Sequence, residues 1–173
     1  MDYEGGLLMQ KASIFRGIFA LVCATALAIP AFADIKTFNA AVKAGDYKKA
    51  AAEAKTSWET WDKSDPDTAT VAREFGFAAY MGGDFAAARD FGQFLKEKGA
   101  TLAKPDDQPA TSSVLFAAAS FRIGKDEQSR NALADALKAR EASPGLDTMS
   151  LVASEALYRS DWSEGQFSRA RDS

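Results

Sequence analysis

Hydrophobic residues recur three and four positions apart along most of this chain, the spacing that places side chains on one face of an α-helix. Two clear stripes of this kind are Val71, Phe75, Ala78 and Ala79, and Leu133, Ala136 and Leu137. No segment of comparable length alternates strictly with β-branched residues, as a half-buried strand does. The pattern therefore predicts an all-α fold. The expected helices are 35–44, 48–61, 67–81, 85–98, 110–122, 126–141, 147–159 and 162–172.

The first 33 residues follow a different pattern. Two basic residues precede an apolar run at 17–29, and the triplet Ala31-Phe32-Ala33 comes soon after it. A positive segment, a short apolar segment and a small-x-small site are, in that order, the parts of a Sec-type signal peptide. The run is shorter than the about 20 residues that span a bilayer, so an uncleaved anchor is the weaker interpretation. We expect 1–33 to be a cleaved signal peptide and 34–173 to be one domain of a periplasmic or secreted protein, exported as in Gram-negative bacteria.

Composition restricts the chemistry of this domain. The 173 residues include no His and a single Cys, Cys23, which lies in the presumed leader. An imidazole or thiol nucleophile and a typical zinc site are therefore excluded from the mature chain. The net charge is −3 and no basic tract stands out, which argues against nucleic-acid binding. No nucleotide-binding or hydrolase motif occurs. We predict no cofactor, no metal and no enzymatic activity.

One acidic group deserves mention as a metal candidate. Asp62, Asp65 and Asp67 are spaced like the first ligands of a calcium loop. The sequence after them lacks the glycine and the closing glutamate of an EF-hand. We interpret these carboxylates as helix-capping and turn residues.

Four segments share one order: a small residue, an Asp soon after it, and a small residue a turn later. Their starts recur at intervals of about forty residues, in the range of helical repeats. Each follows one predicted helix and precedes another, so the Gly or Ser permits a tight turn and the Asp accepts from the next helix's N–H groups. The segments begin Gly45-Asp46-Tyr47, Gly83-Asp84-Phe85, Gly124-Lys125-Asp126 and Ser160-Asp161-Trp162. This arrangement predicts four stacked helix hairpins.

The second hairpin resembles the tetratricopeptide (TPR) repeat family. It has Phe75-Gly76, Tyr80, Gly83-Asp84-Phe85 and Ala88 near the positions of the family's large–Gly pair, aromatic residue, turn and small residue. The first hairpin matches through Gly45-Asp46-Tyr47 and Ala50. The third has Ala117 in place of Gly76, and the fourth has Ser160 and Gly165 in place of the turn Gly and the small residue. The resemblance implies a TPR-like α-solenoid of about four units, with a non-repeating helical bundle as the alternative.

In the TPR family the first helix of each hairpin lines a concave groove that binds peptides. Carried over to this chain, the groove residues are Arg73, Phe77, Tyr80, Phe121, Arg122 and Tyr158. The resemblance implies that Arg73 and Arg122 hold a carboxylate of the peptide. The alternative is that both are ordinary surface charges. Trp58 and Trp61 lie three residues apart on one helix face, and we interpret them as core residues.

These observations favour an exported scaffold that mediates protein or peptide interaction in the bacterial envelope. Its partner would be a protein or peptide rather than a nucleic acid, and no membrane span would remain after signal cleavage. A second interpretation, by family analogy, is the N-terminal region of a larger envelope protein such as a TonB-like energy transducer. A third is a carboxylate-based enzyme, which would need two convergent carboxylates that the sequence does not make evident.

Overall fold

The computed structural model describes residues 35–124, 126–141, 147–163 and 165 of the chain. Over these ranges the protein is all-α, with no strand. The helices are α2 (Lys36–Lys43), α3 (Tyr47–Thr60), α4 (Thr68–Gly82), α5 (Phe85–Lys98), the short 3₁₀ helix η3 (Gly99–Thr101), α6 (Pro109–Gly124), α7 (Glu127–Glu141) and α8 (Thr148–Ser163). The predicted signal peptide, and most of the predicted helix 162–172, lie outside the described residues.

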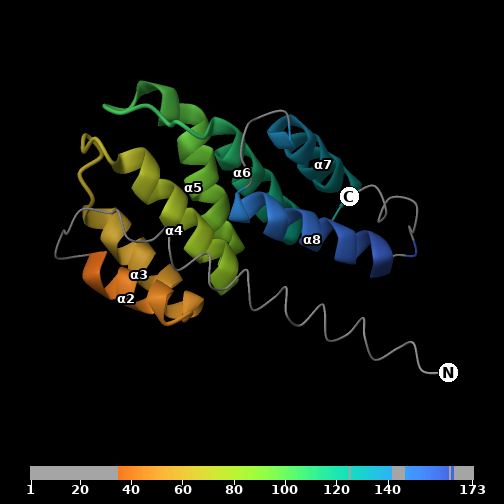
Figure 1. Ribbon diagram of the computed structural model, residues 1–173, viewed down its shortest axis with the longest axis horizontal. Helices are drawn as coiled ribbons and strands as arrows, with labels where there is room; N and C mark the ends of the chain where they lie inside the picture. Colours follow the sequence, from red (N-terminus) through yellow and green to blue (C-terminus); the bar gives the residue numbers. More distant parts are fainter. Residues whose placement is uncertain (1–34, 125, 142–146, 164, 166–173) are drawn as a thin grey trace.

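The helices follow one another along the molecule, from α2 and α3 at one end to α7 and α8 at the other (Figure 1). Consecutive helices pack together, and α6 also contacts both α4 and α8. The first seven predicted helices are confirmed, with bounds that agree within one or two residues except at the end of α8. Within the described ranges no helix has the length and apolar content needed to cross a membrane.

The first two predicted turns are confirmed, and their backbones are nearly the same. Gly45 and Gly83 have φ values of 72° and 86°, in the left-handed region that favours glycine. In each turn the following Asp side chain caps the next helix. The distances are 3.1 Å from Lys49 N to Asp46 Oδ1 and 3.1 Å from Ala87 N to Asp84 Oδ1.

The fourth predicted turn, at Ser160, is wrong. Helix α8 continues through Ser160 to Ser163, and the glycine with positive φ in this region is Gly165, whose φ is 73°. Ser160 carries a Cβ atom, which disfavours the left-handed conformation of the other turns. Asp161 lies fully buried against Arg130, with contacts of 2.7 Å from Nε and 2.5 Å from Nη2.

The core is built from small residues around a few aromatic rings. Phe75 of α4 is fully buried, and its ring centroid lies 4.7 Å from that of Phe38 and 6.0 Å from that of Phe91. Trp58 joins the same cluster, 5.2 Å from Phe91, and the Trp61 indole N–H donates to Thr68 Oγ1 at 3.0 Å. Both tryptophans therefore contribute to packing.

Two glycines let α6 lie directly on the preceding hairpin. A Cβ atom added to Gly76 would lie 2.5 Å from Leu115 Cδ2, and one added to Gly92 would lie 2.8 Å from the Cα atom of Phe116. A larger residue at Gly92 would push α6 away from α5, and one at Gly76 would displace the Leu115 side chain and the Phe91 Cβ atom, because such distances are far below van der Waals contact. This close packing fixes the position of α6, which forms part of the site described next.

Candidate functional site

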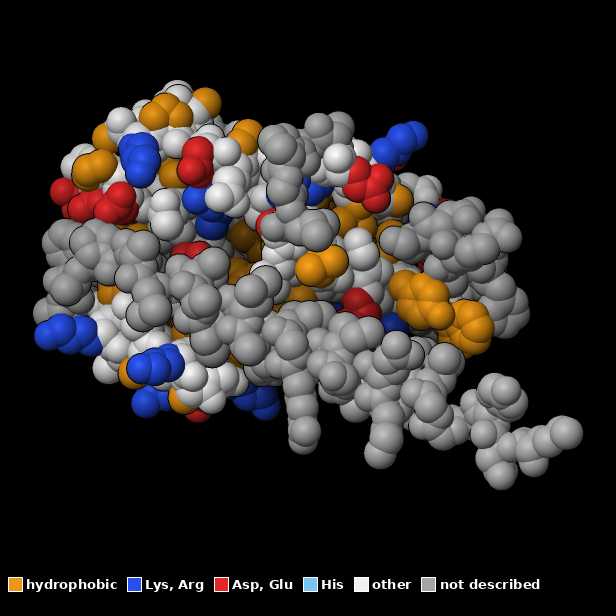
Figure 2. All heavy atoms as spheres, in the orientation of Figure 1, with side chains coloured by type: hydrophobic (Ala, Val, Ile, Leu, Met, Phe, Trp, Pro, Cys, Tyr) orange, Lys and Arg blue, Asp and Glu red, His pale blue; other side chains and the backbone are white. Residues whose placement is uncertain are grey.

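A pocket of about 320 Å³ lies where α4, α6 and the start of α8 meet, with α2 and the start of α3 at its edge. We call it the α4–α6–α8 pocket. Its apolar lining is Val42, Tyr47, Phe77, Ala78, Leu115 and Met149, and its polar lining is Arg73, Glu74, Gln108, Thr111, Ser112, Asp147 and Thr148. Figure 2 shows hydrophobic side chains within a hollow near the middle of this face. The volume is at the lower end of the range for ligand sites, about 300–1,000 Å³.

Helix α4 presents its lining residues by simple periodicity. Phe77 lies four residues after Arg73 and three after Glu74, so the three side chains lie on the same side of the helix. Residues on the opposite face, among them Ala72 and Phe75, are fully buried in the core. Burial of that face holds the pocket-lining face toward α6 and α8.

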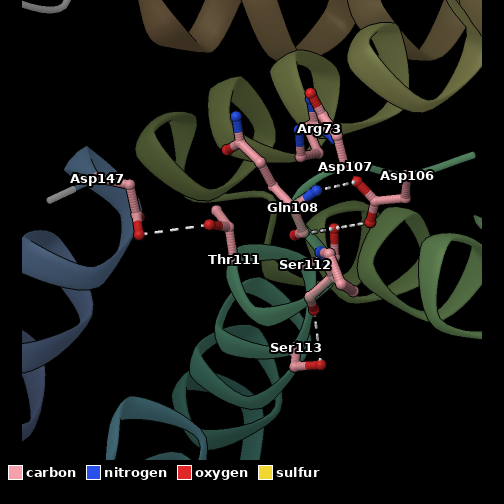
Figure 3. Close-up of polar contacts among 9 residues, drawn as sticks. Arg73, Asp106, Asp107, Gln108, Thr111, Ser112, Ser113 and Asp147 are labelled. Carbon is pink, nitrogen blue, oxygen red and sulfur yellow. Dashed lines mark hydrogen bonds and ion pairs between the residues drawn. The ribbon is translucent and has the colours of Figure 1, made fainter. Parts of the chain in front are cut away.

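Arg73 is held by two carboxylates of the loop before α6. Its guanidinium forms ion pairs with Asp106 and with Asp107, the second at 3.0 Å (Figure 3). Asp106 is almost fully buried and also accepts from Ser112 Oγ at 2.7 Å and from the Gln108 backbone N–H at 3.0 Å. The positive charge of Arg73 is therefore balanced, and its side chain is fixed at the edge of the pocket.

Asp147 fixes the opposite edge. It caps α8 by accepting from the Ser150 backbone N–H and hydroxyl, each at 2.8 Å. Thr111 Oγ1 donates to it at 3.3 Å (Figure 3), and Arg140 Nε donates to it at 2.6 Å. This one carboxylate thus connects α6, α7 and α8, and its charge is balanced by Arg140.

Glu74 differs from the other charged residues of the pocket. Among the residues that the structure describes, it makes no hydrogen bond or ion pair. Burial raises the pKa of its carboxyl, and the neighbouring Arg73 charge only partly opposes that shift. Near it, Phe77 packs edge-to-face on Tyr47, with ring centroids 6.2 Å apart. The pocket therefore combines an unpaired carboxyl with an aromatic wall.

The six predicted groove residues lie in different places. Arg73 and Phe77 line the pocket. Tyr80 and Phe121 are core residues, 4% and 5% exposed. The Tyr80 ring packs on Phe85 of the next helix, with centroids 5.4 Å apart, because this end of α4 is covered by its hairpin partner. Its hydroxyl is buried with no hydrogen-bond partner in the described part of the chain.

The other two predicted residues lie on the surface, away from the pocket. The exposed Arg122 guanidinium stacks over the Phe85 ring, 4.5 Å from its centroid. Tyr158 is 41% exposed and stacks on Trp162 with centroids 6.0 Å apart. Arg73 and Arg122 therefore do not form one cationic patch: the first is paired with aspartates and the second lies on an aromatic ring.

Glu74 and Asp147 were not among the residues that the sequence pattern singled out. A signal for Glu74 was present, because Arg73 and Glu74 are the only charged residues of α4. A charged pair within an otherwise apolar helix indicates a special environment. Asp147 precedes Ser150 by three residues and so has the spacing of an N-cap, but its contacts to α6 and α7 have no local signal.

Neither a metal site in the described residues nor similarity to a known protein indicates what the pocket residues do. Within the described ranges no group of three or more Cys, Asp or Glu could hold a metal ion. No protein-family model, curated protein or solved structure matches the chain. The function is therefore argued from the pocket and the sequence alone.

Proposed function

We propose that this chain is an exported, TPR-like helical-repeat scaffold that binds a protein or peptide segment in the bacterial envelope. One observation carries the proposal: α4 and α6, which begin successive hairpins, and the start of α8 together line one pocket. A hollow with apolar walls and a few placed polar groups is typical of binding sites. Peptide binding across successive first helices is also what the resemblance to the TPR family implies.

The fixed edges of the pocket support this proposal. Arg73 is held by Asp106 and Asp107, and Asp147 is held by Thr111 and Arg140. Side chains that are already ordered lose little conformational freedom when a partner binds. The pocket therefore has the pre-organisation that a binding surface needs.

Site-specific photo-crosslinking tests the binding surface. We would place p-benzoylphenylalanine at Gln108, which is exposed and lines the pocket, and, as a matched control, at the exposed Glu97 of α5. A crosslinked partner is expected from position 108 and not from position 97. Phe77→Ala, which removes an aromatic wall, should abolish the crosslink without unfolding the protein. Equal crosslinking from both positions would overturn the proposal.

The export part of the proposal rests on the order of basic, apolar and small residues in 1–33. We predict that the chain expressed in a Gram-negative host is recovered from the periplasm and begins at Asp34. Intact-mass measurement checks the cleavage. A periplasmic mass that still includes 17–33 would contradict it.

One observation favours a carboxylate-based enzyme as a second candidate. Glu74 and Asp147 line the same pocket, and the raised pKa of Glu74 suits a general acid. Asp147 is nevertheless occupied by three donor side chains, from Arg140, Ser150 and Thr111, which leaves it little freedom as a nucleophile. Turnover of a chromogenic glycoside or ester, lost in Glu74→Gln, would favour the enzyme over the scaffold.

A further inference from the structure

The charges around the α4–α6–α8 pocket are unevenly compensated. Arg73 faces Asp106 and Asp107, and Asp147 faces Arg140. Glu74 lines the pocket with no ion-pair or hydrogen-bond partner in the described chain. When it is ionised, the pocket therefore holds one uncompensated negative charge. An acidic partner would be repelled here, because both described guanidiniums near the pocket are already engaged by aspartates, Arg73 by Asp106 and Asp107 and Arg140 by Asp147.

The pocket that Glu74 lines has apolar walls. Phe77 of the same helix, Leu115 of α6 and Met149 of α8 line the same pocket. A ligand group that fills this space needs an apolar body and a cationic head. Lysine and arginine side chains have this form, because their methylene stems pack on apolar surface while the charged end meets a polar group. An aromatic wall such as Phe77 adds favourable cation–π attraction.

We propose that the α4–α6–α8 pocket binds a lysine or arginine side chain of the protein or peptide partner, with Glu74 accepting from the cationic end. The stem lies against Phe77, Leu115 and Met149. This inference deepens the proposed binding function and rests on it.

Two further observations agree with a basic partner. Burial raises the pKa of the Glu74 carboxyl, and an adjacent cation would reverse that shift by stabilising the ionised form. The whole chain carries a net charge of −3, which attracts basic partners at long range. The chain thus sacrifices some stability at Glu74 in the free state, as is common at sites that await a ligand.

A peptide selection followed by calorimetry tests the inference. A phage-displayed random peptide library is selected on the purified protein. The best synthetic peptide is then titrated by isothermal calorimetry, beside versions in which each basic residue is replaced by norleucine. The selected sequences should share a Lys or Arg, and one norleucine replacement should weaken binding at least about tenfold, the effect of losing a buried charge partner.

Glu74→Gln provides the matched test on the protein side. It should weaken binding of the parent peptide by a similar factor and leave the affinity for the norleucine peptide nearly unchanged. The effects of the two changes on binding are then not additive. Glu59→Gln, at an exposed carboxylate of α3, is the control and should bind like the parent protein. Glu74→Gln removes an unpaired charge without changing shape, so it should fold at least as well as the parent.

The possible failures of this inference and of the proposed function can be told apart. Some selected peptides could lose binding to Phe77→Ala and yet need no basic residue, or bind Glu74→Gln as tightly as the parent protein. Either result would overturn the inference and leave the binding function standing. Free lysine or spermidine that competes as strongly as the peptide would make the occupant a small amine and also overturn it. A selection that yields no pocket-dependent peptide would overturn both.

Discussion

The turn between α4 and α5 and the segment around Ser160 in α8 have similar sequences and different structures. Both have a small residue, then Asp, then an aromatic residue. In the first, Gly83 adopts a φ of 86° and Asp84 caps α5. In the second, the helix continues and Asp161 is buried against Arg130.

The comparison shows that Asp does not determine the turn. The residue before it decides whether the chain can leave the helix, because a left-handed conformation costs a residue with a Cβ atom about 1–2 kcal/mol. The Asp then takes whichever donor is available. Asp84 faces the free N–H groups of a helix start, whereas Asp161 faces a guanidinium from α7.

The largest expected effect is at Asp161. Replacing it by Ala removes the carboxylate that pairs with the partly buried Arg130, and breaking a buried ion pair in this way costs about 3–5 kcal/mol. The equivalent change Asp84→Ala removes only a helix cap, at about 1 kcal/mol. Urea unfolding of both variants measures the difference. Equal losses would show that the buried pair contributes no more than a cap, and the double variant Arg130→Met with Asp161→Leu should recover most of the stability.

The next largest effect is expected at Gly83. Gly83→Val should cost about 2–3 kcal/mol, because a β-branched residue is poorly tolerated at positive φ. A Cβ atom added there would meet no atom within 4 Å, so the expected loss comes from the backbone conformation. Gly83→Asn is the matched control and should lose much less, since Asn tolerates this conformation. Thermal melts of the two variants that overlay the parent would contradict this account of the turn.

A smaller loss of stability is expected for Ser160→Gly, whereas the repeat alignment implies a gain. If Ser160 were a turn residue, Ser160→Gly would stabilise the protein. Because it lies inside α8, the change should cost about 0.5–1 kcal/mol, as glycine does in a helix interior. An increase in the free energy of unfolding would restore the predicted fourth turn.

The smallest effect is expected at Glu74, the helix carboxylate with no partner in the described chain. Burial raises the pKa of Glu74 in the folded state. The contribution of Glu74 to the free energy of unfolding is therefore greatest below the ordinary Glu pKa. That contribution is lost as the pH rises through the raised value. Glu74→Gln should therefore raise the melting temperature slightly at neutral pH and leave it unchanged in acid. A gain that is the same at both pH values would show that ionisation is not the cause.

Local signals were sufficient to predict most of the helical structure. Helical periodicity located α2 to α8, and Gly45 and Gly83 located two turns, because both features are properties of neighbouring residues. The pair Arg130–Asp161 joins residues 31 apart and the pair Arg73–Asp106 residues 33 apart. No local pattern indicates which carboxylate such an arginine will meet.

The candidate site was predicted only in part, for the same reason. Arg73 and Phe77 were expected on the groove side and do line the pocket. Tyr80 lies seven residues beyond Arg73, on nearly the same face of an ideal helix, but it is buried against Phe85. A helical register gives the direction of a side chain but not the neighbour that covers it. The role of Glu74 likewise depends on α6 and α8, which only the tertiary structure brings to it.

The contact between Gly76 and Leu115 links how two positions can evolve. Leu115 is a wall of the pocket, and its Cδ2 atom occupies the space that a Cβ atom at position 76 would need. A lineage that shortens residue 115 to admit a bulkier ligand would remove one of the two close contacts that exclude alanine at position 76, the other being the Phe91 Cβ atom at 2.9 Å. If a small shift of Phe91 then let alanine become established there, the return to leucine at 115 would meet the Leu115 clash again. A glycine outside the pocket lining can thus record past changes in what the pocket accepted.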